Sequence, residues 1–199
     1  MIVKCIAKFG RDLPLDALVL RDGFDVEQEF RLIINKHYVV YGMILYSGYV
    51  WYYICDESYG YYPSWNPSPL FNVEDGRLSK YWLYSFEKGK NRDMSETRWA
   101  YPEWVNEPYY YDHLTDGDER EVKIFQKYKA HMDIEFPNPS ITERATALDE
   151  EWLMCPLCID AWRSLCKEGM VICPKCKHML HNPRYENKKI SLISDAVPN

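Results

Sequence analysis

Two short stretches decide the fold of the C-terminal part of this chain: Cys155-Pro156-Leu157-Cys158 and, after a gap of 14 residues, Cys173-Pro174-Lys175-Cys176. Each Cys-Pro-x-Cys stretch predicts a tight turn that directs two sulfur atoms to one point, and two such turns complete a tetrahedron of thiolates. The gap is slightly shorter than is usual between paired cysteines of zinc sites, but the arms between such turns vary in length. Four thiolates leave no coordination position open, so the pattern predicts one structural zinc ion and no catalytic metal.

The paired turns resemble the knuckles of a zinc ribbon, and this resemblance implies a ribbon over residues 153–193. Cys166 lies between the knuckles and is interpreted as a spare thiol on the ribbon arm. His178 and His181 follow the second knuckle, and the segment His181-Asn182-Pro183-Arg184-Tyr185 is expected to pack over the site or to orient its ligands. The alternative is that one of these histidines replaces a cysteine ligand.

Composition places the chain among globular proteins with a substantial core. Its 199 residues suit one domain with a small appendage, 47% of them are hydrophobic, and 17 Tyr and 7 Trp make it rich in aromatics. No segment approaches the roughly 20 apolar residues of a membrane span, and the first eight residues do not form a signal peptide. Seven cysteines, four of them predicted metal ligands, favour a reducing cytoplasm over a secreted disulfide scaffold.

Charge is unevenly distributed around the formal total of -6. From Met154 onward there are seven Lys and Arg against four Asp and Glu, whereas the preceding 153 residues carry 17 against 26. An acidic body of this kind repels nucleic-acid backbones and attracts basic partners.

The first part of the chain reads as short strands joined by tight turns. We expect two hairpins, turning at Ser47-Gly48 and at Asp75-Gly76, because such pairs favour the positive φ of hairpin turns. The expected strands are Ile2–Lys8, His37–Tyr46, Tyr49–Cys55, Leu70–Glu74 and Arg77–Phe86. Their number and order resemble an SH3-like barrel over Met1–Glu87, and the fold class is α+β, with an antiparallel barrel or rolled sheet in residues 1–115.

Two later segments have no strand pattern. Residues 61–69 contain three prolines and are predicted to be a surface loop, and residues 88–115 show no periodicity and are predicted to be a long aromatic loop.

Two helices are expected in residues 116–152, packing on the β-rich domain or linking it to the ribbon. The first runs from Asp118 to Glu135, with a capping box between Asp118 and Glu121 and an apolar face. The residues of that face are Val122, Phe125 and Met132. The second runs from Ser140 to about Trp152, and a strand is expected at Lys189–Ile193.

The aromatic residues suggest a surface for a partner. Strand alternation sends Tyr49, Trp51 and Tyr53 to one face and Val50, Tyr52 and Ile54 to the other. One face is expected to be core, and the other to be an aromatic surface unless the long loop covers it. Tyr and Trp are favoured at protein interfaces. The predicted partner-binding residues are Trp51, Tyr53, Trp65 and Trp104.

Three classes of function remain open. Cys5 and Cys55 read as buried thiols and Asp112-His113 has no nucleophile beside it, so no catalytic motif is found and an enzyme is the least favoured class. The general character of the chain resembles bacterial immunity proteins, which neutralise toxins, and implies a cytoplasmic module that binds a basic protein. The alternative is nucleic-acid binding through a basic cluster near the second knuckle. That cluster consists of Lys175, Lys177, Arg184, Lys188 and Lys189.

Overall fold

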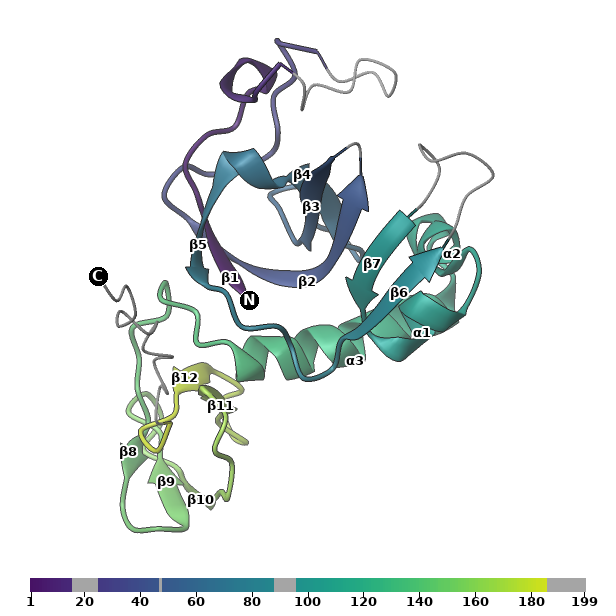
Figure 1. The fold of residues 1–199 in the computed structure, drawn as a ribbon. Coiled ribbons are helices and arrows are strands. Elements are labelled where there is room, and N and C mark those ends of the chain that lie inside the picture. Colours follow the sequence, from purple (N-terminus) through teal and green to yellow (C-terminus); the bar gives the residue numbers. More distant parts are fainter. Residues whose placement is uncertain (16–24, 47, 88–95, 186–199) are drawn as a thin grey trace, which may run out of the picture. The chain divides into compact units, whose positions relative to one another are not determined.

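The computed structural model describes residues 1–15, 25–46, 48–87 and 96–185, and they belong to two compact units. Unit 1 spans Met1–Ser140 and unit 2 begins at Ile141. Sequence analysis had placed boundaries after residues 115 and 152 instead. The predicted α+β class with mostly antiparallel sheets is confirmed. Figure 1 shows the fold and labels its strands and α-helices.

Unit 1 contains one antiparallel sheet, two 3-10 turns and three helices in its described residues. Its elements are β1 (Ile2–Cys5), η1 (Gly10–Asp12), β2 (His37–Tyr46), β3 (Tyr49–Ile54), β4 (Ser64–Pro67), η3 (Ser68–Leu70), β5 (Phe71–Asp75), β6 (Leu83–Glu87), β7 (Glu96–Ala100), α1 (Pro102–Asn106), α2 (Tyr110–Asp116) and α3 (Glu119–Glu135).

The long strand β2 organises this sheet. Its first residues pair with β1, and its last residues pair with β3 on one edge and β7 on the other. The pairing with β3 shifts register between Val40 and Gly42, which bends the strand. Gly42 permits the close approach of β7, because a Cβ atom there would lie 3.3 Å from the carbonyl oxygen of Trp99.

The sheet is rolled, but it does not close. Its main path runs β4-β3-β2-β1-β5, with β7 and β6 branching from β2, and in the described residues β4 and β5 do not pair with each other. Figure 1 shows β1 to β5 curling around a common interior. The rolled sheet of the sequence analysis therefore fits, whereas no closed SH3-like barrel is found.

Both faces of the sheet are buried. The alternation predicted for β3 is correct, since Tyr52 and Ile54 enter the interior cluster of the rolled sheet. Trp51 and Tyr53 enter a second cluster, to which α1, α2 and α3 also contribute and which is called the cluster beneath the helices. Residues 96–116 supply β7, α1 and α2, so the prediction of a long loop there is wrong. These helices have five and seven residues, too few for a helical period, but Pro102 begins α1 and Gly117 ends α2 with a φ of 86°.

Helix α3 is confirmed, starting one residue later than expected. Phe125 and Met132 are fully buried in the cluster beneath the helices, and Val122 packs partly against it. The predicted capping box is absent, because the Asp118 side chain makes no capping hydrogen bond. Its carboxylate contacts Nδ1 of His113 at 2.9 Å instead, and the Glu121 carboxylate binds Arg120.

The turn predictions had mixed outcomes. The β2–β3 hairpin is confirmed by the pairing of Tyr46 with Tyr49 and by a φ of 82° at Gly48, while Ser47 lies outside the described residues. The hairpin at Asp75-Gly76 is wrong, because β5 pairs with β1 and the Asp75 carboxylate accepts hydrogen bonds from Arg77. The proline segment is not only a loop, since it contains the edge strand β4, where prolines are tolerated.

Unit 2 is built from short strands in its described residues. They are β8 (Thr146–Ala147), β9 (Trp152–Met154), β10 (Ala161–Arg163), β11 (Met170–Ile172) and β12 (Met179–His181). The helix predicted for Ser140–Trp152 is wrong. Backbone bonds from Ala145 to His181 and from His181 to Glu143 hold this stretch extended along β12, so tertiary pairing overrides helix propensity. The predicted strand at 189–193 lies outside the described residues.

Candidate metal centre and tyrosine-lined cleft

The four knuckle cysteines converge in unit 2. Their Sγ atoms all lie within 4.8 Å of one another, and the Cys155–Cys176 and Cys158–Cys173 pairs are each 3.6 Å apart. Sulfurs around a tetrahedral zinc, with Zn–S bonds of about 2.3 Å, lie about 3.8 Å apart, whereas a disulfide requires about 2.05 Å. The cysteines are therefore free thiols in an arrangement that could hold one metal ion.

The two knuckles repeat one backbone design. In each, the N–H group after the second cysteine donates to the carbonyl oxygen of the first cysteine at 3.0 Å. The N–H of the first cysteine donates to the carbonyl of the residue five positions later at 2.9 Å. The residues after the second cysteines, Ile159 and Lys177, have φ values of 60° and 62°, a left-handed conformation that is unusual for a β-branched residue. The hairpins β9–β10 and β11–β12 thus present their sulfur pairs in the same way.

Electrostatics of the thiols suit a cation. Burial opposes ionisation of Cys173, but hydrogen bonds from the N–H groups of Cys176 and Lys175 lower its pKa to about 7. For Cys176, the hydrogen bond from the His178 N–H is outweighed by burial and by the neighbouring sulfurs, which raise its pKa to about 12. The Cys173 thiol therefore ionises readily, whereas the neighbouring sulfurs disfavour a second thiolate at Cys176. A divalent cation bound between the sulfurs would favour the thiolate form of both.

The histidines near the second knuckle do not join the sulfur group. Nε2 of His181 contacts the carbonyl oxygen of Ile141 at 2.7 Å, and His178 is exposed. Cys166 directs its Sγ toward the carbonyl of Met170 at 3.9 Å and packs against the buried cluster of unit 2. In the described residues, the metal group consists of the four cysteines alone.

Two further residues fix the loops between the hairpins. Asn182 is buried and its Nδ2 donates to the carbonyls of Cys166 and Glu168. The Arg184 guanidinium donates to three carbonyls, those of Ser164, Asp149 and Trp152. The sequence placed both residues in the segment 181–185 that was expected to pack over the site, and Arg184 also in a basic cluster, but it does not show which carbonyls a loop leaves open.

The predicted partner-binding residues are mostly inside unit 1. Trp51, Tyr53 and Trp104 are at most 5% exposed and belong to the cluster beneath the helices. Trp65 is half-buried and its ring contacts those of Tyr46 and Trp51. Of the two outcomes left open for that face of β3, cover by the segment after residue 88 is the one found, because α1 and α2 pack over it.

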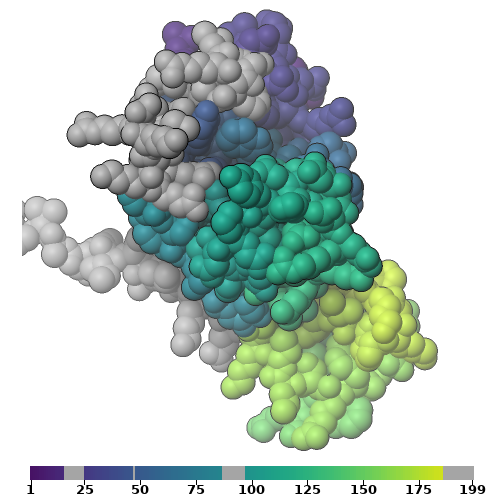
Figure 2. Space-filling model, turned by 90° about the vertical axis from the view of Figure 1, so that its right-hand side faces the viewer, coloured from purple at the N-terminus to yellow at the C-terminus, as the bar shows by residue number. Residues whose placement is uncertain are grey.

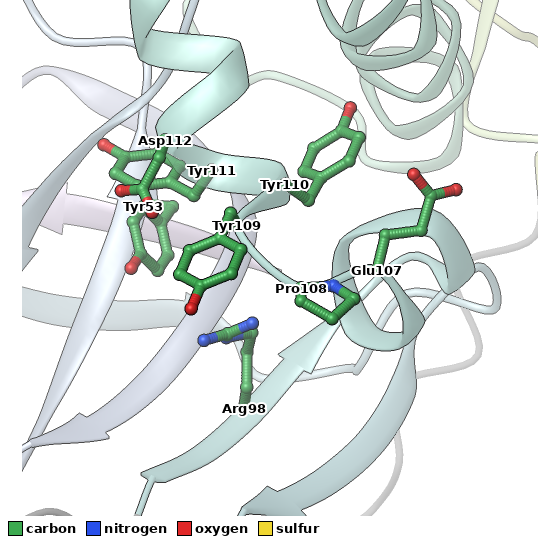
Figure 3. Close-up of a pocket in the computed structure, with 8 residues that line it drawn as sticks. All are labelled: Tyr53, Arg98, Glu107, Pro108, Tyr109, Tyr110, Tyr111 and Asp112. Atoms are coloured by element: carbon green, nitrogen blue, oxygen red, sulfur yellow. The ribbon is translucent and has the colours of Figure 1, made fainter.

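A cleft of about 450 Å³ opens in unit 1 beside these helices. Figure 3 shows its lining, which comprises Tyr53, Arg98, Glu107, Pro108, Tyr109, Tyr110, Tyr111 and Asp112. The rings of Tyr110 and Tyr111 are fixed by hydrogen bonds from their hydroxyls to the carbonyls of Glu121 and Pro63. Burial raises the pKa of both tyrosines, so both hydroxyls stay protonated and donate at neutral pH.

Tyr109 differs from the other tyrosines of the cleft. It is 74% exposed and adopts a φ of 60° as the residue before α2, a conformation that bulky residues rarely hold. Figure 3 shows Arg98 reaching from β7 toward this ring. The sequence shows the run of tyrosines but gives no sign that only the first of them faces outward.

The segment around the cleft is strongly acidic. Residues 102–121 contain seven Asp and Glu against one Arg. The one arginine, Arg120, forms an ion pair with Glu107, whose side chain points away from Tyr109 in Figure 3. The exposed carboxylates of Asp112 and Asp116 have no ion pair in the described residues. In Figure 2 the α1–α2 segment, in teal, forms a continuous surface on the face turned to the viewer.

Among the helices of the described residues, none combines the length and apolarity needed to cross a membrane. Comparison of the chain with models of protein families, with curated protein sequences and with solved structures gave no match.

Proposed function

We propose that the protein is a non-enzymatic, zinc-binding interaction module, in which unit 2 is stabilised by one Zn²⁺ and unit 1 binds a basic protein. The observation that carries the second part is the cleft, which is lined by exposed Tyr109 and by Asp112, a carboxylate without an ion pair in the part of the chain that the structure describes. Aromatic side chains supply contact area at interfaces, and surrounding carboxylates steer a basic partner toward them.

The metal assignment rests on the donor set. Four cysteine sulfurs at tetrahedral spacing favour zinc, and with all four bound the ion has no place for water or substrate. The metal would then stabilise the fold of unit 2 and perform no chemistry. Cysteines 155, 158, 173 and 176 would hold it as thiolates, with the knuckle N–H groups as hydrogen-bond donors.

Within the class of interaction modules, a cytoplasmic immunity-type protein that neutralises a basic toxin fits this surface. An acidic site can mimic the nucleic acid that a basic nuclease would bind. The free thiols at the metal group suit a reducing compartment.

The described part of the basic cluster gives less support to nucleic-acid binding. Arg184 is committed to backbone carbonyls and Lys175 lies 3.7 Å from the carboxylate of Asp160. Lys177 is exposed, and Lys188 and Lys189 lie outside the described residues.

The test is to compare the two kinds of partner directly. Proteins that co-purify from the native host are identified by mass spectrometry, produced separately and titrated against the zinc-loaded chain, in parallel with mixed DNA and RNA. We expect a basic protein to bind, with an affinity that falls as salt rises. Micromolar binding of nucleic acid that is lost on charge reversal at Lys175 and Lys177, without a stable protein partner, would refute the proposal.

A further inference from the structure

The tyrosine-lined cleft of unit 1 has walls that are fixed before any ligand arrives. Tyr111 stacks on Trp104 with an interplanar angle of 4°, and the rings of Tyr53 and Tyr111 lie 5.0 Å apart. The hydroxyls of Tyr110 and Tyr111 are engaged by backbone carbonyls. A ligand would therefore meet a preformed aromatic wall. The volume of the cleft, about 450 Å³, is in the range of sites that enclose a small group.

Tyr109 is the most exposed of the tyrosines that line the cleft. Its hydroxyl has no hydrogen-bond partner in the described residues, and its ring is mostly exposed although its backbone is held at positive φ. Asparagine or glycine would adopt this backbone conformation with less strain. The ring thus lines the cleft while most of its surface stays exposed.

The charges around the cleft select the ligand. Asp112 lines it with a carboxylate that has no ion pair in the described residues, whereas Glu107 is bound by Arg120. Arg98, the cation of the lining, donates to the carbonyl of Trp104. Of the seven carboxylates of residues 102–121, four have a Lys, Arg or His partner, whereas Asp112 and Asp116 have no ion pair in the described residues. These charges would repel a polyanionic ligand. A cationic group, in contrast, would be attracted both by the Asp112 carboxylate and by the faces of the tyrosine rings.

We propose that this cleft receives a lysine or arginine side chain of the partner, enclosed by Tyr109 and the Tyr53–Tyr111 wall and paired with Asp112. This inference rests on the proposed function and deepens it, because it names the chemical group by which a basic partner is recognised.

Short peptides test this assignment without knowledge of the partner. The zinc-loaded full chain is titrated calorimetrically with acetylated decapeptides in which glycine alternates with arginine, lysine, citrulline or glutamate. Citrulline matches arginine in shape but carries no charge. We expect the arginine and lysine peptides to bind and the citrulline and glutamate peptides not to bind.

Matched variants locate the binding. Tyr109→Ala, Tyr109→Asn and Asp112→Asn should each weaken binding of the arginine peptide about tenfold, as loss of a cation–π contact or an ion pair predicts. Tyr109→Asn keeps a residue that tolerates positive φ. Asp116→Asn removes the same charge from the same helix outside the lining, and Tyr84→Ala removes another exposed tyrosine of unit 1; both should change affinity less than threefold.

Four other results would contradict the cleft assignment or the proposed function. Equal losses for Asp112→Asn and Asp116→Asn would overturn the cleft and leave only diffuse electrostatic attraction, as would unchanged binding after the Tyr109 substitutions. If no basic peptide binds but a basic host protein does, the cleft assignment fails while the proposed function stands. If neither binds, both fail.

Discussion

Unit 1 buries its side chains in two clusters of fifteen and thirteen residues, whereas the buried cluster of unit 2 has six members, two of which are metal-site cysteines. The clusters of unit 1 are dominated by aromatic and branched side chains that touch across a rolled sheet. Unit 2 offers short strands of two or three residues and few apolar contacts. One chain thus contains two different solutions to the problem of stability.

The difference follows from size. Unit 2 spans Ile141–Asn199, and in a unit of fewer than about 70 residues apolar burial alone barely offsets the loss of chain entropy, so such folds often rely on disulfides or metals. Unit 1 is large enough to do without either, and its cysteines, Cys5 and Cys55, act as apolar side chains. The predictions below separate these two modes of stabilisation.

Removal of metal should have the largest effect. Chelation of Zn²⁺ is expected to unfold unit 2 and leave unit 1 folded, because structural zinc contributes about 10–16 kcal/mol to folds of this kind. Amide NMR spectra with and without chelator, together with the metal content of the protein, would measure this. Cys166→Ser is the control and should keep one zinc per chain. A protein that binds no zinc after reconstitution would refute the claim that unit 2 is stabilised by a metal.

The second largest effect is expected from a substitution that truncates a side chain in the core of unit 1. Phe125→Ala removes a fully buried ring and should lower the free energy of unfolding by about 3–5 kcal/mol, without change in zinc content. Val122→Ala, at a partly buried position on the same helix, should cost clearly less. Denaturant unfolding followed by tryptophan fluorescence gives both values. A loss below about 1 kcal/mol for Phe125→Ala would show that this face of α3 contributes little.

A smaller effect is expected where unit 2 relies on hydrogen bonds. Arg184→Lys keeps the charge but loses the fork that reaches three carbonyls, and should destabilise zinc-loaded unit 2 by about 1–3 kcal/mol. Arg163→Lys, which affects an exposed pair with Glu151, should cost less than about 1 kcal/mol. Thermal unfolding at fixed zinc concentration compares the two variants. Equal stability of both would mean that Arg184 serves a purpose other than holding the loops.

The smallest predicted change is a gain. Ile159→Gly relieves a left-handed conformation in the first knuckle and should stabilise unit 2 by about 0.5–1 kcal/mol, because the relief exceeds the added freedom of the unfolded chain. Ile172→Gly, in strand β11, should do the opposite. The same unfolding experiment detects both signs. Destabilisation by Ile159→Gly would indicate that the exposed isoleucine makes a contact worth more than the strain.

The sequence predicted best where chemistry is local. The paired cysteines, the β2–β3 turn and the apolar stripe of α3 each depend on residues close together in the chain, and all agree with the structure. The helix expected at 140–152 failed because its capping signal competed with pairing to β12, some 40 residues away. Strand pairings of that kind leave no mark in a single sequence.

The candidate site of unit 1 was located only in part. Strand alternation placed Trp51 and Tyr53 on the correct face, but their exposure depended on whether later residues cover that face. Helices α1 and α2 are too short to be recognised by period, so the sequence left open whether this segment covers the face and gave no sign of the cleft beside it. What a sequence lacks here is the sum of many weak tertiary contacts.

The cluster beneath the helices has a consequence for biosynthesis. Ile2 and Phe136 belong to the same buried group, so the two ends of unit 1 meet in its core. A nascent chain that stops short of α1 and α2 leaves the face containing Trp51 and Tyr53 uncovered, and one that stops short of α3 still lacks Phe125 and Met132 in the same cluster. Pairing across such separations is slow. Unit 1 therefore completes its fold late in translation, after nearly all of its residues have left the ribosome. Until then its aromatic face is a natural target for chaperones.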